Sequence, residues 1–267
     1  MKSLREIFDL TDKWALITGG QGHLAGTMAK TLAGLGANVI LVDLDIQKLE
    51  QAKQNLLKTS KSKVKIFVCN LEEEKQRDDL IMKIISEHQN LDVLINNAAF
   101  VGSSKLEGWT GDIYDQSIHT WRRALEVNLT SVFHLCQGLM PLLEKSSSGS
   151  IINIGSIYGE HGPDWSLYED TDLSNPAAYS ASKGGLMQLT RWLATTVAPK
   201  VRVNAISPGG IERQQPDIFR QRYIARTPMK RLATEDDFSG ITAYLATNAS
   251  SYVTGQVIRV DGGWGVW

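Results

Sequence analysis

Short, almost uninterrupted apolar runs alternate with helical patterns along the whole chain. The apolar runs, which read as strands, occupy residues 14–18, 38–43, 64–69, 91–97, 150–156, 201–207 and 256–263. Helical patterns occupy residues 27–36, 46–58, 78–88, 120–145, 178–198 and 235–247. Strands that are apolar on both faces are typical of a parallel sheet covered by helices on both sides. The alternation therefore predicts an α/β fold with a doubly wound parallel sheet, in a single domain over residues 1–267.

Composition and charge exclude several classes of protein. The 267 residues carry a net charge of -1, which gives no basic field for nucleic acid or an anionic membrane surface. No apolar run reaches the ~18 residues of a membrane span, and the charged start lacks the apolar core of a signal peptide. Cys69 and Cys136 lie far apart, and neither they nor the five histidines have metal-ligand spacing. We expect a cytoplasmic protein with no metal, nucleic-acid or membrane partner.

A glycine-rich loop follows the first strand and opens the first helical pattern. Gly20, Gly22 and Ala25 fit the spacing G-x-G-x-x-A, in which glycine lets the backbone approach a pyrophosphate and the small third residue lets helix and strand pack. Gly19 is expected to shape the turn, and the helix start offers N–H groups to an anion. His23 is expected either near the pyrophosphate or bonded to the helix start. The loop indicates a dinucleotide site of the Rossmann type; the alternative is an ordinary turn without a ligand.

Asp43 ends the second strand, about 20 residues after the glycines, where a carboxylate accepts hydrogen bonds from the adenosine ribose. A 2′-phosphate at that position would be repelled by about 4 kcal/mol at 4 Å and an effective dielectric near 20. Leu44 and Asp45 supply no compensating cation. The sequence therefore predicts NAD as the cofactor, in preference to NADP.

Tyr179 and Lys183 are four residues apart in a helical pattern and share one face of that helix. A nearby ammonium favours the phenolate and lowers the pKa of a tyrosine, which suits proton transfer to or from a hydroxyl. The alternative is a surface Tyr–Lys pair without a role in catalysis.

Several motifs in one order resemble the short-chain dehydrogenase/reductase family, in its single-domain type, over roughly residues 13–263. After the glycine loop they are NNAA at 96–99, Asn128 in a long helix, Ser156 after the fifth strand, YSASK at 179–183, NAISPGG at 204–210 and VDGG at 260–263. The resemblance implies an oxidoreductase that binds a small-molecule substrate and assembles into homodimers or homotetramers.

The resemblance also implies roles for individual residues. Tyr179 would be the acid/base, Lys183 would lower its pKa and bind the nicotinamide ribose, Ser156 would bind the substrate oxygen, and Asn128 would hold a water of a proton relay. Alternatives stay open for Asn128, as a helix interruption, and for Ser156, as a strand-end turn residue. The residues that the resemblance and the loop place against the cofactor are Gly19, Gly20, Gly22, His23, Leu24, Asp43, Asn70, Leu71, Asn97, Ala98, Ala99, Tyr179, Lys183, Pro208, Gly209 and Ile211.

The chain departs from the family pattern at three places. His23 and Ala25 stand where the single-domain type usually has glycine, Asn70 replaces an aspartate that usually meets the adenine, and no threonine follows Gly209 in the P-G motif. Asn70 can still accept and donate hydrogen bonds. The contact usually made to the carboxamide of the cofactor after Gly209 is left without its usual donor.

The substrate prediction depends on two long loops. Between Ser156 and Tyr179 lies an acidic insertion, 157–178, which is longer than is usual in the family; residues 212–231 are rich in arginine. Because arginine forks fit phosphate and carboxylate, Arg213 and Arg222 indicate an anionic substrate, such as a sugar acid, a sugar phosphate or a nucleotide sugar. The alternative is a solvated helix whose charges pair with the acidic insertion or a neighbouring subunit. His161 is a further candidate for a substrate contact.

The surroundings of the insertion are similar to short-chain dehydrogenases of flagellin modification and legionaminic-acid pathways, which favours a sugar-derived substrate of bacterial glycan-precursor metabolism. Gluconate or sugar-acid dehydrogenases and 3-oxoacyl-thioester reductases are alternatives, and an inactive NAD-binding regulator is a hypothesis of another class. The aromatic tail, residues 264–267, is predicted to pack on a neighbouring subunit.

Overall fold

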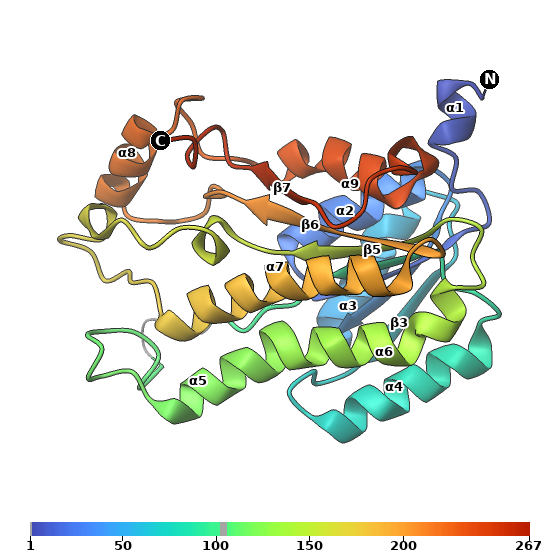
Figure 1. The fold of residues 1–267 in the computed structure, drawn as a ribbon, viewed down its shortest axis with the longest axis horizontal. Coiled ribbons are helices and arrows are strands. Elements are labelled where there is room, and N and C mark those ends of the chain that lie inside the picture. Colours follow the sequence, from blue (N-terminus) through green and yellow to red (C-terminus); the bar gives the residue numbers. More distant parts are fainter. Residues whose placement is uncertain (1, 102–105) are drawn as a thin grey trace.

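One seven-stranded parallel sheet organises the computed structural model, which describes residues 2–101 and 106–267 (Figure 1). The strands follow one another in space in the order β3-β2-β1-β4-β5-β6-β7. Their bounds are β1 (Trp14–Thr18), β2 (Asn38–Asp43), β3 (Val64–Val68), β4 (Val93–Asn96), β5 (Gly149–Ile154), β6 (Val201–Pro208) and β7 (Val257–Val260). The order reverses between β1 and β4, so the crevice for a ligand is expected at the carboxyl ends of these two strands.

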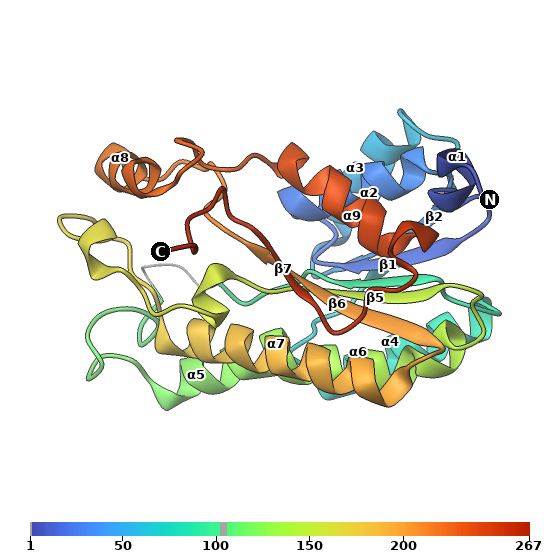
Figure 2. The ribbon, with the colours of Figure 1, turned by 45° about the horizontal axis from the view of Figure 1, so that its top comes forward.

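Two layers of helices cover the sheet (Figure 2). One layer contains α2 (His23–Gly34), α3 (Ile46–Leu57) and α9 (Ser239–Ala246); the other contains α4 (Glu74–Glu87), α5 (Ile118–Leu125), α6 (Ser131–Leu143) and α7 (Ala177–Val197). Along β1, Ala15 and Ile17 face the first layer and Leu16 faces the second. This alternation within an apolar strand gives a core on each side of the sheet, as the sequence predicts.

The helices differ from the sequence pattern at three places. The helix predicted over residues 120–145 is interrupted by a π-helical turn, Glu126–Thr130, between α5 and α6, at the position where the alternative for Asn128 expects an interruption. The helix predicted from residue 27 begins at His23, directly after the glycine loop, and α1 (Leu4–Ile7) precedes the sheet. None of the helices in the described ranges is long and apolar enough to cross a membrane.

A small extra layer lies beyond the carboxyl ends of the strands, at the left of Figure 1. It contains α8 (Asp217–Arg226) and two 3-10 turns of the acidic insertion, η2 (Ile157–Gly159) and η3 (Trp165–Leu167). Two further 3-10 turns, η4 (Glu235–Phe238) and η5 (Asn248–Ser250), flank α9. Ile157 and Leu167 pack with Phe219 and Tyr223 of α8 in a separate apolar cluster. The two long loops of the sequence therefore fold against each other at the ligand-binding edge.

Candidate active site

The glycine loop makes a tight turn, and at two of its glycines the turn leaves no room for a side chain. Gly19 has a φ of +68°, and a Cβ there would lie 2.8 Å from the Asn97 Nδ2 atom. A Cβ on Gly20 would lie 2.7 Å from the Cβ of Leu41 in β2. The close approach at Gly20 is therefore a packing requirement, in addition to any contact with a phosphate. A Cβ on Gly26 would meet nothing within 4 Å.

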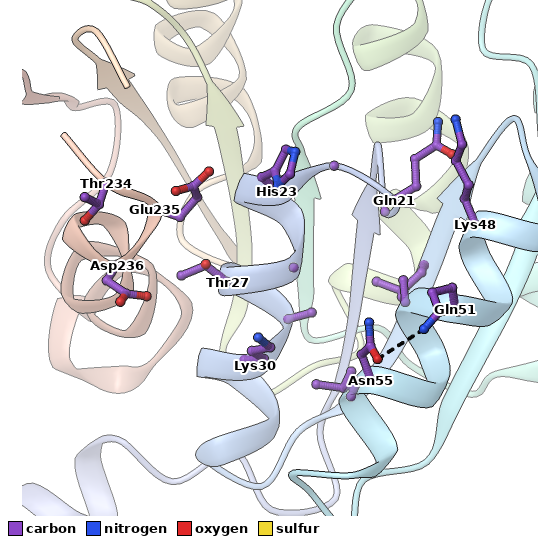
Figure 3. Close-up of a pocket in the computed structure, with 17 residues that line it drawn as sticks. Gln21, His23, Thr27, Lys30, Lys48, Gln51, Asn55, Thr234, Glu235 and Asp236 are labelled. Carbon is purple, nitrogen blue, oxygen red and sulfur yellow. Dashed lines mark hydrogen bonds between the residues drawn. The ribbon is translucent and has the colours of Figure 1, made fainter. Parts of the chain in front are cut away.

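The start of α2 presents backbone donors toward the loop. Gly22 is the N-cap, without a side-chain hydrogen bond, and the first turn contains no acidic residue. His23 is exposed, whereas Leu24 is half-buried against the core. Free N–H groups and the positive end of the helix dipole suit a pyrophosphate. A hollow of about 520 Å³ begins at the same loop and runs between α2 and α3, with Lys48 and Gln51 on its α3 side (Figure 3).

Asp43 is held beside the glycine loop by two backbone donors. Its Oδ2 atom accepts a hydrogen bond from the Gln21 amide at 3.0 Å, and its Oδ1 atom accepts one from the Leu44 amide at 2.7 Å. The carboxylate is therefore fixed at the end of β2, next to the turn that a dinucleotide would cross.

The end of β4 is tied to the end of β1 through Thr18. The Thr18 hydroxyl accepts hydrogen bonds from the amides of Asn97 at 3.0 Å and Ala98 at 3.1 Å. The Asn97 amide group donates to the Thr18 carbonyl at 3.0 Å. Ala99 follows at the same half-buried edge. Thr18 is a residue of the site that the sequence analysis did not predict. Its position at the end of the first strand, directly before the glycines, could have indicated it.

The residues at the ends of β3 and β4 differ in burial: some lie half-buried at the carboxyl edge of the sheet and others lie in its core. Asn70 is half-buried, and its Oδ1 atom accepts a hydrogen bond from the Glu72 amide at 3.1 Å. Leu71 is buried in the core. Asn96 donates to Asn153 in β5 at 2.9 Å. Asn96 pairs with Asn153 in the β4–β5 ladder and also joins the two strands through its side chain.

Ser156, Tyr179 and Lys183 come together beyond the carboxyl end of β5. The Lys183 Nζ atom donates to the Ile154 carbonyl at 2.7 Å and lies 5.8 Å from the centroid of the Tyr179 ring. Burial lowers the pKa of Lys183 to about 8. Burial raises the pKa of Tyr179, while the facing Ser156 hydroxyl acts in the opposite direction. The sequence expectation of a lowered Tyr179 pKa is therefore wrong for the protein alone, because desolvation outweighs the neighbouring groups.

Asn128 occupies the π-helical turn and is fully buried. Its side-chain oxygen accepts a hydrogen bond from the Phe100 amide at 2.6 Å, and its NH2 group donates to the Ser182 hydroxyl at 3.0 Å. Ser182 in turn donates to the Tyr179 carbonyl at 2.8 Å. Asn128 thus links the segment after β4 to the start of α7, and π-helical turns are frequent at functional sites.

The segment after β6 is fixed from two sides. Pro208 ends the strand, and the Gly209 amide donates to the Val260 carbonyl at 3.0 Å. The Gly210 amide donates to the Tyr223 hydroxyl at 2.6 Å. Ile211 pairs with Ala233 in an isolated parallel bridge. These contacts hold the P-G motif beside the end of β7 without the missing threonine.

The two arginines expected to bind an anionic substrate are already paired with carboxylates. Arg213 contacts Glu235 at 2.6 Å, and Arg222 contacts Asp170 of the insertion at 3.6 Å. Arg226 forms a further ion pair with Asp164. Arg222 and Arg226 of α8 therefore pair with the acidic insertion, as the alternative expects, whereas Arg213 lies before α8 and pairs with Glu235 of η4. These ion pairs occupy the arginines on which the anionic-substrate prediction relies, and that prediction stays a prediction.

Trp264 overturns part of the prediction for the aromatic tail. It is 1% exposed and stacks on Tyr223 within the same chain, with ring centroids 5.9 Å apart. His161 packs edge-on against it, with ring centroids 5.9 Å apart, and a Cβ on Gly265 would approach the His161 Nε2 atom to 2.6 Å. His161 therefore supports the tail, and only the end of the tail, with Trp267 70% exposed, remains for a neighbouring subunit.

A search of the described residues finds no group of three or more histidine, cysteine, aspartate or glutamate side chains arranged to hold a metal ion. The glycine cradle, the uncapped start of α2 and the fixed Asp43 carboxylate together fit a dinucleotide. Ser156, Tyr179 and Lys183 lie at the same edge of the sheet, where the reactive end of such a cofactor would lie.

Known proteins match almost the whole chain. Residues 23–265 match the family described as enoyl-(acyl carrier protein) reductase. Nodulation protein G of a Rhizobium species, strain N33, is 33% identical over 264 residues, which cover 96% of this chain and 98% of that protein. The 3-oxoacyl-(acyl-carrier-protein) reductase of Thermotoga maritima is 30% identical over 262 residues, with 95% and 98% covered.

A solved structure matches as well. The gluconate 5-dehydrogenase of Burkholderia cenocepacia, in complex with NADP and tartrate, has a TM-score of 0.86 and 25% sequence identity. The alignment covers 99% of this chain and 100% of that one.

Proposed function

This chain belongs to the short-chain dehydrogenase/reductase family of oxidoreductases, and we propose that it interconverts a secondary alcohol and a ketone with NAD. The observation that carries the proposal is the meeting of Ser156, Tyr179 and Lys183 at the carboxyl edge of the sheet. That edge also holds the glycine cradle and Asp43.

Each of these side chains has a distinct task in the proposed reaction. The nicotinamide, when bound, accepts or donates the hydride. Tyr179 takes the proton of the alcohol during oxidation, or returns it to the ketone oxygen during reduction, at its phenol oxygen. Ser156 donates a hydrogen bond to the same substrate oxygen, and the Lys183 ammonium binds the nicotinamide ribose and favours the phenolate. Asn128 fixes the start of α7 and is proposed to hold the water that connects Lys183 to solvent.

Asp43 is the basis for proposing NAD. Its carboxylate, held by the amides of Gln21 and Leu44, would accept hydrogen bonds from the ribose hydroxyls and repel a 2′-phosphate. The gluconate 5-dehydrogenase that resembles this chain was solved with NADP, so the choice of cofactor is a direct test of the role of Asp43. We expect kcat/KM to be at least about tenfold higher with NAD than with NADP, which corresponds to a difference of about 1.4 kcal/mol in transition-state stabilisation.

The substrate proposed is a sugar-derived, hydroxyl-rich molecule of bacterial glycan-precursor metabolism. The similarity of the insertion to flagellin-modification and legionaminic-acid dehydrogenases supports it, as does the likeness to a gluconate 5-dehydrogenase. A 3-oxoacyl-thioester reductase is the second candidate, because relatives named 3-oxoacyl-(acyl-carrier-protein) reductase are 29% and 30% identical to this chain.

The test is a substrate panel followed at the absorbance of the reduced cofactor. Sugar alcohols, sugar acids, nucleotide sugars and a 3-oxoacyl thioester are assayed with NAD and with NADP. Tyr179→Phe is expected to lower kcat by a factor of about 10²–10⁴, because it removes the proton-transferring hydroxyl. Tyr252→Phe, at a tyrosine that is fully exposed, is the matched control and should leave kcat unchanged. Equal rates in the three proteins would remove Tyr179 from the proposed mechanism, and no turnover of any substrate in all three would favour an inactive NAD-binding regulator.

A further inference from the structure

The acidic insertion places a connected group of polar side chains beside the proposed catalytic residues. The hydroxyls of Tyr158 and Tyr168 are 2.5 Å apart, and the Ser180 hydroxyl donates to the Asn175 side-chain oxygen at 2.9 Å. The Asn175 amide faces both phenols and lowers the pKa of each, although burial raises both pKa values overall. Four polar side chains therefore form one network, three of them contributed by the insertion.

This network reaches the catalytic residues from one side. The backbone amide of Tyr158 donates to the Ser156 hydroxyl at 3.2 Å, which fixes the start of the insertion, and with it the Tyr158 residue, next to Ser156. Tyr168 lies close enough to Tyr179 that the charge of one phenolate would raise the pKa of the other. The network is therefore adjacent to the oxygen atoms that would hold the reacting alcohol.

The same network reaches an open pocket on its other side. A cavity of about 960 Å³ lies between the segment 110–116 and the insertion, and Tyr168, Asn175 and Ser180 form part of its wall. The cavity thus opens the network to solvent, and Ser180 in its wall directly follows Tyr179 in the chain.

The charged side chains that line this cavity are all acidic. They are Asp112, Asp115 and Asp172, and the lining drawn from the described residues includes no lysine or arginine. The nearest arginines, on α8, pair instead with Asp164 and Asp170 of the insertion. A carboxylate or phosphate in this cavity would face like charges, whereas sugar hydroxyls would find acceptors and donors.

We propose that Tyr168 and Asn175 are substrate-binding residues, and that this cavity selects an uncharged, hydroxyl-rich substrate, a neutral sugar or sugar alcohol, over a carboxylated or phosphorylated one. The inference rests on the proposed function and narrows its substrate class. In this arrangement the phenol of Tyr168 and the amide of Asn175 hydrogen-bond hydroxyls next to the reacting carbon, which Ser156 and Tyr179 hold.

The first experiment compares matched substrates. Sorbitol, ribitol and galactitol are assayed against gluconate and sorbitol 6-phosphate with NAD, and binding of each to the NAD-bound protein is measured by calorimetry. We expect neutral compounds to have a kcat/KM at least about tenfold higher and to bind more tightly. Tighter binding of the acid or phosphate overturns the inference, and so does binding of neither class. Turnover of only a 3-oxoacyl thioester would overturn it too, while leaving the oxidoreductase function in place.

The second experiment separates binding from a structural role. Tyr168→Phe and Asn175→Ala each remove one hydrogen-bonding group and should raise KM for the best neutral substrate about tenfold, with kcat changed less than about threefold. Asp115→Asn combined with Asp172→Asn should lower KM for gluconate and leave that for sorbitol nearly unchanged. Tyr252→Phe is the control. Unchanged KM values in Tyr168→Phe and Asn175→Ala, with unchanged melting temperatures, would refute the assignment.

Discussion

Lys183 is a fully buried cation whose ammonium donates to a backbone carbonyl, that of Ile154. Burial lowers its pKa from 10.5 to about 8. Below pH 8 the lysine is protonated in the folded and the unfolded chain, and the cost of burying the charge is fully present. Between pH 8 and about 10.4 only the unfolded chain keeps the proton, so stability rises with pH over this window.

We therefore predict that the free energy of unfolding of the NAD-free protein increases between pH 7.5 and 10.5 relative to a Lys183→Met variant. The expected gain is about 3 kcal/mol, from 1.36 kcal/mol per pKa unit. Urea unfolding of both proteins at several pH values measures it. Parallel pH curves for the two proteins would show that the lysine keeps an ordinary pKa.

Gly19 in the loop is crowded, whereas Gly26 in the first turn of α2 has open space around it. Gly19→Ala should destabilise the fold by at least about 1–2 kcal/mol, because alanine is strained at a φ of +68° and its Cβ would clash with Asn97. It should also weaken NAD binding. Gly26→Ala, where the Cβ meets nothing, should stabilise α2 by about 0.5–1 kcal/mol. Thermal melts and NAD titrations of both variants make the comparison, and equal effects would contradict the roles given to the loop.

At the level of elements, the sequence predicts the sheet well because its strands are apolar on both faces and short. Every predicted strand overlaps an observed one. The π-helical turn was not predictable from periodicity, because Asn128 takes its place through hydrogen bonds to Phe100 and Ser182, far away in sequence. The ion pairs of Arg222 and Arg226 in α8 were not predictable for the same reason, because their partners Asp170 and Asp164 lie more than 50 residues earlier, in the insertion.

The contact between α8 and the insertion has one ion pair that is partly buried and one whose carboxylate is exposed. Arg226 pairs with Asp164, and its guanidinium lies 4.4 Å from the Trp264 ring centroid. Arg222 pairs with Asp170 at 3.6 Å, and that aspartate is 82% exposed.

We predict a coupling free energy of about 1 kcal/mol for Arg226 and Asp164, and less than about 0.3 kcal/mol for Arg222 and Asp170, since exposed pairs are weak. Double-mutant cycles to alanine, measured by urea unfolding in low salt, give both values. A larger coupling for the exposed pair would mean that the insertion is held mainly through Arg222.

On the scale of the whole molecule, the site follows from the sheet order. The reversal between β1 and β4 brings the glycine loop beside Asn97, and β5 and α7 supply Ser156 and Tyr179 at the same edge. Motif spacing was sufficient to propose these residues as candidates. It was insufficient for Trp264, whose burial against Tyr223 depends on how the chain end folds back over α8.

The exposed apolar side chains of one helical layer bear on assembly. We propose a homodimer or homotetramer that pairs α6 and α7, which lie side by side on one outer layer (Figures 1 and 2). Phe133 of α6 is 39% exposed and Trp192 of α7 is 53% exposed, and large apolar side chains on a helical layer indicate a protein contact.

Phe133→Lys combined with Trp192→Lys should therefore convert the oligomer to a monomer, because two charges in an apolar interface lose hydration without gaining partners. Sedimentation velocity at several protein concentrations measures the state. Tyr252→Lys, at an exposed residue outside these helices, should sediment like the unmodified protein. A monomeric unmodified protein would refute the proposed assembly, and an oligomer that survives the double change would place the interface elsewhere.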